Sequence, residues 1–318
     1  MAYSRFGFIT DTHYDCKYDC RKDDALSSLI DKTRQCYEWF RQVGCEFVIH
    51  GGDVFDRHRI YNFDMMKRVR DVFRSSGLKT YYIMGQHDLS GYNPNTLNAS
   101  SLGFLDSISD GSLQLIESEI DIGGYHFVAS HVNMDPVKSV NEYNVAHDRP
   151  VIFVCHALLT DERDAFGTIS ITHFKNPCVS LVLSGDLHDG IRLQLCNGIQ
   201  FYNPGALARD SKGTRMPKAG VLQYDDRYNE FLLMEFHPKC KPCDEIFFWN
   251  DDSQIETAPV TTPEKKPLKN NYDFIDDFCK FKSESKDIYE LLERIGRANG
   301  IQDEVLDLIK RHKDLKTE

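Results

Sequence analysis

The amino-acid sequence predicts an α/β fold with two sheets, and three observations point to it. Short runs rich in Val, Ile, Phe and Tyr recur between residues 5 and 236, and their near-continuous apolarity is typical of buried strands. Amphipathic stretches with helical spacing separate the first three runs, and strand-like runs predominate from about residue 113 to residue 237. The opening half therefore has the pattern βαβαβ, and the later half predicts a second sheet, either mixed or antiparallel.

The expected strands are short, as buried strands usually are. In order along the chain they are RFGFIT, CEFVIHGG, KTYYIMG, YHFVASH, VIFVCH, VSLVLSG, GIQFYN, GVLQY and FLLMEF. Two turn signals lie among the later runs, GG at residue 123 and CNG at residue 196.

Two amphipathic helices are expected between the first three strands, at residues 23–43 and 62–77. Side chains able to face a core recur at helical spacing in both stretches. They are Leu26, Leu29, Ile30, Thr33 and Tyr37 in the first, and Met65, Met66, Val69 and Phe73 in the second. Each stretch ends at a glycine, Gly44 or Gly77, which is typical of a helix C-terminus.

The composition changes after residue 248, so we divide the chain into three parts. Residues 1–248 contain all the expected strands and form the main domain. Residues 249–272 are rich in Pro, Thr and charge and carry little apolar periodicity, which predicts a linker. Residues 273–318 predict a helical tail that either docks on the main domain or presents an apolar stripe to a partner.

Charge and hydropathy exclude several classes of protein. The net charge is −11, with 49 acidic and 38 basic residues, so any nucleic-acid contact is expected to be local or shared with a partner. No run approaches the roughly 18 consecutive apolar residues of a membrane span. The start MAYSRFGFITD lacks the basic and long apolar regions of a secretory signal. We therefore expect a cytoplasmic protein that does not contact a membrane.

Polar side chains able to bind metals follow five of the expected strands. They are Asp11 and His13 after the first run, Asp53 after the second, the segment GQHD (residues 85–88) after the third, His156 after VIFVC, and Asp186 with His188 after VSLVL. A single such residue is usually only a turn residue. Because strand ends on one edge of an α/β sheet face a common crevice, five together are expected to converge on a site.

The donor atoms of this set are oxygen and imidazole nitrogen, without thiolate. Such donors suit hard or borderline divalent ions such as manganese, iron or zinc. The excess of carboxylates suggests two ions, since clustered anions would otherwise repel one another. Paired ions about 3.5–4 Å apart serve in-line phosphoryl displacement, because they activate water and clamp the leaving oxygen.

The ordered series DTH, GGDVFD, GQHD, CHALL and SGDLH resembles the calcineurin-like metallophosphoesterase superfamily. The continuation YNPGALAR is similar to SbcD-type nuclease subunits, which process DNA double-strand ends and recombine DNA with an ABC-ATPase partner. The resemblance runs from about residue 5 to residue 225. It implies a two-sheet sandwich flanked by helices and a site for two divalent ions, for which we expect Mn²⁺.

Carried over position by position, the resemblance implies two sets of metal ligands that share Asp53. The first metal would be held by Asp11, His13, Asp53 and His188, and the second by Asp53, Gln86, His156 and Asp186. His131 is an alternative to His156, but VIFVCHALL fits the pattern better.

The resemblance also implies catalytic roles for His87 and Asp88. His87 would be left without a metal and would protonate the departing oxygen as a general acid. Asp88 would orient His87 or its neighbours.

Two ligand positions depart from the family pattern, which usually has asparagine at the position of Gln86 and histidine at that of Asp186. The glutamine amide keeps a ligating carbonyl oxygen but sits one methylene further out. Asp186 replaces a neutral nitrogen ligand with a charged oxygen, which could restore affinity for a hard ion. We therefore expect the two departures to compensate each other.

A basic loop follows the last motif in this otherwise acidic chain. The segment ARDSKGTRMPKAG carries four cations, Arg209, Lys212, Arg215 and Lys218, and Arg57 follows GGDVFD directly. A charge run is usually a solvated surface, but its place beside the expected catalytic edge favours contact with phosphate. Aromatic residues are not interleaved with these cations, so we expect recognition of the DNA backbone without sequence specificity.

The favoured function is a dinuclear-metal phosphodiesterase that acts on DNA ends, as the catalytic subunit of an SbcCD-like complex in a bacterial or phage-infected cell. By analogy with the family, the tail would bind an SbcC-like ABC-ATPase, and helices of the first half would pair two subunits as a homodimer. The alternatives are a protein phosphatase, because GGDVFDR resembles a phosphatase motif, a cyclic-nucleotide phosphodiesterase, or a non-enzymatic scaffold.

Overall fold

The computed structural model describes residues 3–15, 21–145, 147–161, 167–209 and 216–247. The linker (249–272) and the helical tail (273–318) lie outside the described residues, so both stay predictions. Within the described part, none of the helices has the length and apolarity that a membrane span requires.

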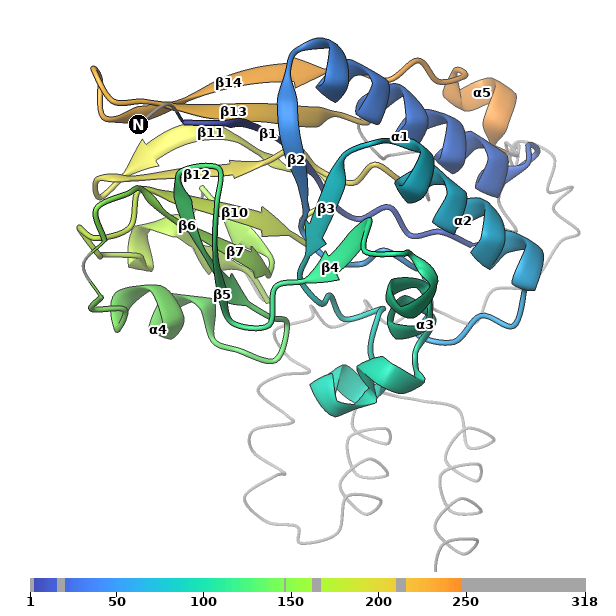
Figure 1. Cartoon of the computed structure of the whole chain (residues 1–318), viewed down its shortest axis with the longest axis horizontal. Helices are drawn as coiled ribbons and strands as arrows, with labels where there is room; N and C mark the ends of the chain where they lie inside the picture. Colours follow the sequence, from blue (N-terminus) through green and yellow to red (C-terminus); the bar gives the residue numbers. More distant parts are fainter. Residues whose placement is uncertain (1–2, 16–20, 146, 162–166, 210–215, 248–318) are drawn as a thin grey trace, which may run out of the picture. The chain divides into compact units, whose positions relative to one another are not determined.

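The first sheet has six strands in the order β14-β13-β1-β2-β3-β4 (Figure 1). They are β1 (Arg5–Ile9), β2 (Cys45–His50), β3 (Lys79–Tyr82), β4 (Leu113–Leu115), β13 (Ala219–Asp225) and β14 (Glu230–Phe236). Strands β1 to β4 run parallel. Strand β13 pairs antiparallel with β1, and β14 pairs antiparallel with β13 at the edge.

The second sheet also has six strands, in the order β11-β12-β10-β7-β6-β5. They are β5 (Glu119–Ile122), β6 (Tyr125–Ser130), β7 (Val151–His156), β10 (Leu181–Gly185), β11 (Ile191–Cys196) and β12 (Ile199–Asn203). Strands β6, β7, β10 and β12 are parallel, and the edge strands β5 and β11 are antiparallel to their neighbours. A second sheet, mixed or antiparallel, was predicted, and the structure shows that it is mixed.

The two sheets pack face to face, and alternate residues of their strands fill the space between them. Phe6 and Phe8 of β1 point into this layer, where they meet Phe127 of β6 and Leu183 of β10. Phe6 packs edge-on against Phe127 with ring centroids 5.4 Å apart. The intervening residues are apolar as well, because helices cover the other face of the first sheet.

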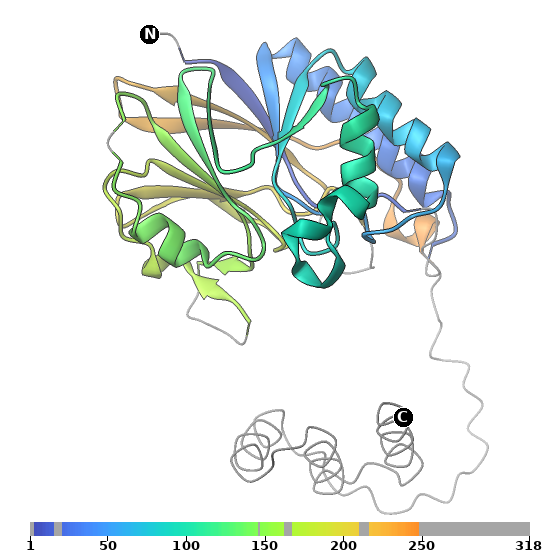
Figure 2. The same cartoon turned by 60° about the horizontal axis from the view of Figure 1, so that its bottom comes forward.

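Three helices cover the outer face of the first sheet (Figures 1 and 2): α1 (Ala25–Gln42), α2 (Phe63–Ser75) and α3 (Ser101–Ile108). The carboxylate of Asp24 accepts a hydrogen bond from the Ser27 backbone at the start of α1, and the Asn62 side chain caps α2 in the same way. Gly44, with φ +78°, follows α1 as predicted.

The outer face of the second sheet is covered by shorter elements. They are α4 (Pro136–Asn141), the strand pair β8 (Leu159–Thr160) and β9 (Ile169–Ser170), and the 3₁₀ turn η3 (Ile171–His173). The remaining short elements are η1 (Ser90–Tyr92), η2 (Pro94–Ala99) and α5 (Cys243–Ile246).

The assignment of strands to sheets needs one correction. Residues 113–237 were expected to form the second sheet, but β4, β13 and β14 belong to the first. Strand β13 joins the first sheet because the backbone of β1 would otherwise be unpaired on one side. There β13 pairs with β1, with Phe8 opposite Gly220. The short strands β4, β5 and β11 and the helix α3 were not predicted.

Candidate metal centre

Five strands bring the predicted ligands to one edge of the sandwich. In the first sheet β1, β2 and β3 end there, and in the second sheet β7 and β10 end there. The segments that follow these strands therefore meet, although they are up to 177 residues apart between Asp11 and His188.

The backbone is unusual at four of the predicted ligands. The φ angle is +51° at Asp11, +43° at His13, +52° at Asp53 and +73° at Asp186. Residues other than glycine seldom adopt this left-handed region, although aspartate tolerates it better than most. Such conformations concentrate at functional sites, where the surrounding structure holds them in place.

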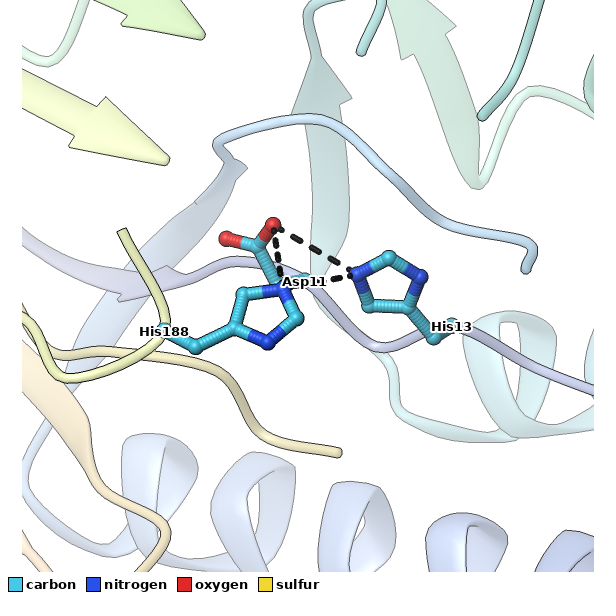
Figure 3. A group of neighbouring side chains, drawn as sticks. All are labelled: Asp11, His13 and His188. Carbon is cyan, nitrogen blue, oxygen red and sulfur yellow. Dashed lines mark hydrogen bonds and ion pairs between the residues drawn. The ribbon is translucent and has the colours of Figure 1, made fainter. Parts of the chain in front are cut away.

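Asp11, His13 and His188 form the first group of donors (Figure 3). Nε2 of His13 lies 3.2 Å from Nε2 of His188 and 3.6 Å from Oδ1 of Asp11. Nε2 of His188 lies 3.8 Å from the same carboxylate oxygen. Metal–ligand bonds of about 2.1 Å give ligand separations of about 3–4 Å, so these three atoms suit a single divalent ion.

Asp53 lies between this group and a second group of donors, which consists of Gln86, His156 and Asp186. Its Oδ2 is 3.8 Å from Nε2 of His13 and 3.3 Å from Nε2 of His156, which places it within reach of both. On the second side, the Gln86 amide nitrogen donates to Oδ1 of Asp186 at 2.6 Å. The backbone nitrogen of Asp186 in turn donates to the Asp11 carboxylate at 3.1 Å. The two predicted ligand sets are thus brought together around Asp53.

Three buried atoms of Asp53 and the second group have no hydrogen-bond partner among the described residues: Oδ2 of Asp53, Oε1 of Gln86 and Nε2 of His156. A buried amide oxygen left without a partner, such as that of Gln86, costs about 1–3 kcal/mol, whereas the Asp53 carboxylate and the His156 ring are within ion-pair distance of each other. All three are the atoms through which these residues would ligate a metal. The donor set therefore fits a divalent ion.

The charges of the site also favour cations. Burial alone would lower the pKa of His156, but the carboxylates of Asp53 and Asp11 outweigh it and raise the pKa to about 10. Burial likewise opposes protonation of His13, yet Asp11 and Asp56 raise its pKa well above the ordinary value. Protons held by these imidazoles compete with metal for the same nitrogen atoms, so metal binding must release them.

The family model for the calcineurin-like phosphoesterases matches residues 4–190, more than half of the chain. This chain is a calcineurin-like phosphoesterase. Membership in this metallophosphoesterase superfamily implies a metal-dependent phosphoester hydrolase, and the donor groups around Asp53 fit a site for two metals.

Solved structures similar to this phosphoesterase share little sequence with it. A dimetal phosphatase from Danio rerio has 12% identity and a TM-score of 0.48, over 73% of this chain and 99% of that one. The protein TT1561 of Thermus thermophilus has 12% identity and a TM-score of 0.46, over 73% and 98%. The nuclease MPE of Pseudomonas putida has 14% identity and a TM-score of 0.32, over 68% and 82%. None of the curated proteins matches the chain.

Asp88 holds two ligand loops of the phosphoesterase together. Its buried carboxylate accepts hydrogen bonds from the backbone nitrogens of Asp53 at 2.9 Å, Val54 at 3.0 Å and Gly85 at 3.0 Å. Burial, with the nearby charge of Asp53, raises the pKa of Asp88 to about 7. The two loops that Asp88 joins approach each other closely at Gly85. A Cβ on Gly85 would lie only 2.1 Å from Oδ1 of Asp53. Asp88 is therefore a positioning residue, and it acts on Asp53.

His87 lies at the open side of the centre, with its side chain 42% exposed. Nδ1 is 2.6 Å from the backbone oxygen of Asp56, so this nitrogen carries a proton and donates it. Nε2 lies 4.0 Å from Oδ2 of Asp53. The ring thus presents Nε2 toward the Asp53 carboxylate.

Asp56 is a residue of the centre that was not predicted. Its Oδ1 lies 3.4 Å from Nδ1 of His13, on the side of the ring away from Asp11. The hydrogen bond with His13 lowers the pKa of Asp56. A carboxylate behind a ligating histidine fixes the orientation of the ring. The signal was the second aspartate of GGDVFD.

His131 has a structural role in this phosphoesterase. Nδ1 accepts a hydrogen bond from the Met84 backbone nitrogen at 3.2 Å, and Nε2 lies 3.0 Å from the backbone oxygen of Glu117. Both ring nitrogens are therefore used, and His156 is the histidine at the centre.

The predicted phosphate-binding cations differ in position. Arg57 pairs with Asp15 through two contacts of 2.9 Å, and Nζ of Lys218 lies 3.1 Å from Oε1 of Glu235. Arg209 is buried and donates to the backbone oxygen of Lys241 at 2.9 Å. Its burial removes it from any surface that DNA could contact, which corrects the prediction for Arg209. Lys212 and Arg215 lie outside the described residues.

Proposed function

We propose that this phosphoesterase hydrolyses phosphodiester bonds at DNA ends, as the catalytic subunit of an SbcCD-like complex. The observation that carries the proposal is the pair of donor groups that share Asp53, with Nε2 of His87 beside them. Any phosphate ester that is cleaved must release an alkoxide, so a proton donor at this point suits phosphoester hydrolysis.

The YNPGALAR segment supports the choice of DNA over other phosphoesters, because it resembles the SbcD-type subunits. In this chain it packs on the ligand loops. The backbone nitrogen of Ala208 donates to the backbone oxygen of Asp11 at 3.1 Å, and that of Ala206 donates to the backbone oxygen of His188 at 3.0 Å. The segment that carries the resemblance is thus in direct contact with the first group of donors.

In this proposal Asp11, His13, Asp53 and His188 hold one ion, and Asp53, Gln86, His156 and Asp186 hold the other. Bound divalent ions supply Lewis acidity toward the phosphoryl group and a water activated at neutral pH. We favour Mn²⁺, because the donors are mainly carboxylate, amide and imidazole. His87 gives its proton to the oxygen that leaves.

The proposed partners are DNA, bound through its backbone, and an SbcC-like ABC-ATPase that binds residues 273–318. The net charge of −11 agrees with a division of labour in which the ATPase supplies most of the DNA-binding charge. We also propose a homodimer, and a cytoplasmic setting in a bacterial or phage-infected cell.

The test uses end-labelled linear duplex DNA with Mn²⁺, beside bis-p-nitrophenyl phosphate and p-nitrophenyl phosphate. Asp53→Asn removes the shared carboxylate, and Asp226→Asn, at an exposed position between β13 and β14, is the matched control. We expect the wild type and Asp226→Asn to release DNA label and to cleave the diester. Asp53→Asn is expected to do neither.

Two outcomes would contradict the proposal. Activity on the monoester alone would assign the protein to the phosphatases. Cleavage of the diester without any loss of DNA label, even with the ATPase added, would favour a small cyclic-nucleotide substrate.

A further inference from the structure

A second cluster of histidine and carboxylate groups lies on the edge hairpin of the second sheet. The strand alternation of β5, the edge strand, places Glu119 and Asp121 on the same face. Asp121 is the direct cross-strand partner of His126 on β6. Nδ1 of His126 lies 2.7 Å from Oδ1 of Asp121, and Nε2 lies 3.4 Å from Oε2 of Glu119.

His147 joins the cluster from the connection between α4 and β7. Its ring stacks on that of His126, with centroids 3.7 Å apart and an interplanar angle of 20°. The Tyr143 hydroxyl lies 2.6 Å from Nε2 of His147 and so fixes the ring. One donor atom from each of Asp121, His126 and His147 lies within 4.8 Å of the others.

Burial distinguishes this cluster from an ordinary surface ion pair. His126 is 4% exposed, and its Nε2 has no hydrogen-bond partner among the described residues. Two imidazoles stacked this closely repel each other if both are protonated. If His126 is neutral, it donates through one nitrogen only, and its other nitrogen presents a lone pair to a carboxylate, either Asp121 at 2.7 Å or Glu119 at 3.4 Å. A divalent cation between these donors removes both conflicts.

The cluster is separate from the catalytic centre. His126 pairs with Val151, the first residue of β7, whereas His156 is the last residue of the same strand. Five residues of strand span about 16 Å. The cluster therefore belongs to the opposite edge of the sheet.

We propose that Asp121, His126 and His147 bind a borderline divalent ion of the zinc class, with Glu119 at the Nε2 side of the His126 ring. Two imidazoles combined with carboxylate oxygens are a common donor set for zinc. The hydrogen bond between Tyr143 and His147 orients the His147 ring, as outer partners of ligating histidines usually do. The ion ties the connection before β7 to the β5–β6 hairpin, and it has no part in hydrolysis.

The zinc content of the full-length chain tests this proposal. The protein is stripped with a chelator, dialysed against Zn²⁺ and analysed by mass spectrometry of the metal. His147→Ala and Asp121→Asn are compared with the wild type and with His173→Ala, a control at an exposed histidine of η3. We expect the wild type and the control to hold one zinc ion more per chain than the other two variants. The comparison cancels the zinc bound at the catalytic centre, which all four proteins share.

Two further readouts make the result decisive. Added zinc is expected to raise the Tm of the wild type by more than that of His147→Ala. Cleavage of bis-p-nitrophenyl phosphate with Mn²⁺ is expected to be equal in both, which shows that the variant is folded. If His147→Ala does not fold, Asp121→Asn decides, because its side chain is half exposed. Equal zinc content in all four proteins would overturn the proposal and leave an ion-pair network.

Discussion

Gln86 and Asp186, the two residues that depart from the family pattern, are in direct contact. The Gln86 amide nitrogen donates to Oδ1 of Asp186 at 2.6 Å, while Oε1 of Gln86 has no partner among the described residues. An amide that donates through its nitrogen turns its oxygen to the other side, so this bond determines which atom faces a metal. The extra methylene of glutamine is what allows the amide to reach the carboxylate.

We therefore expect Gln86→Asn and Asp186→His, each alone, to weaken binding of the second Mn²⁺ by about 10–100-fold. Asparagine would be too short to keep the bond, and histidine at 186 would remove the acceptor that orients Gln86. The double variant restores the pair usual in the family and is expected to bind Mn²⁺ more tightly than either single variant. Calorimetric titration of the four proteins with Mn²⁺ forms a double-mutant cycle. Additive losses would show that the two residues act independently.

His87 is the residue whose role can be separated from metal binding. Because Nε2 of His87 is the proposed proton donor, His87→Ala is expected to slow DNA cleavage by about 10²–10⁴-fold. The loss on bis-p-nitrophenyl phosphate should be much smaller, since nitrophenolate leaves without a proton. Metal content, measured in parallel, should stay at the wild-type value. An equal loss on both substrates would instead indicate that His87 binds the phosphate or the metal.

At the scale of elements, α1 carries a buried cation. Lys32 is 1% exposed, and its Nζ donates to the backbone oxygen of Leu207, in the segment that packs on the ligand loops. Burial, together with the charge of Arg21, lowers the pKa of Lys32 to about 7. The amine is thus close to losing its proton in the folded protein at neutral pH, whereas in the unfolded chain it stays protonated to about pH 10.

This pKa shift gives a prediction for stability. Below pH 7 Lys32 is protonated in both the folded and the unfolded protein, so the full cost of burying its charge lowers the free energy of unfolding. Between pH 7 and 10 the unfolded state binds more protons, so the free energy of unfolding rises with pH, by about 3 kcal/mol from pH 7 to 9.5. Urea unfolding at both pH values measures the rise in the free energy of unfolding. Comparison with Lys32→Met, which has no charge at this position, separates the contribution of Lys32 from that of other groups. The same pH dependence in Lys32→Met would contradict the assignment to Lys32.

The strands and the polar residues that follow them could be predicted because both depend on local patterns. β1, β2, β3, β7 and β10 are largely apolar, and each is followed by or ends in residues able to bind metal. The sheet that β13 joins could not be predicted, because an apolar run does not specify its partner. Strand β13 pairs with the otherwise unpaired side of β1, although the two strands are more than 200 residues apart in sequence.

The burial of Arg209 shows the same limit for the predicted phosphate contacts. A basic residue in a charged loop is usually exposed, and the sequence around Arg209 gives no sign of the opposite. The Arg209 side chain donates to the backbone oxygen of Lys241, and the Arg209 backbone oxygen accepts a hydrogen bond from Arg21. Contacts between such distant segments determine which cations remain at the surface.

At the scale of the whole molecule, the described residues include an exposed aromatic patch. Tyr61 is 87% exposed, Phe63 is 81% exposed and Phe104 is 44% exposed. They line one groove of about 310 Å³ between the start of α2 and α3, together with Arg59. Single exposed apolar residues are common, but a contiguous patch marks an interaction surface. The groove follows the Asp53 loop in sequence, and the occupant that we expect on it is a second copy of this chain.

We expect the wild type to sediment as a dimer at micromolar concentration and the double variant Tyr61→Ser/Phe63→Ser to sediment as a monomer. The reason is that serine removes most of the apolar area that a partner would bury, about 25 cal/mol per Å². Tyr228→Ser is the matched control, since Tyr228 is 68% exposed but belongs to the turn between β13 and β14. Cleavage of bis-p-nitrophenyl phosphate per chain should be unchanged in both variants, because each centre is complete within one chain. Cleavage of duplex DNA should fall only in the monomer, and a wild type that is already monomeric, or a double variant that remains dimeric, would refute pairing through this groove.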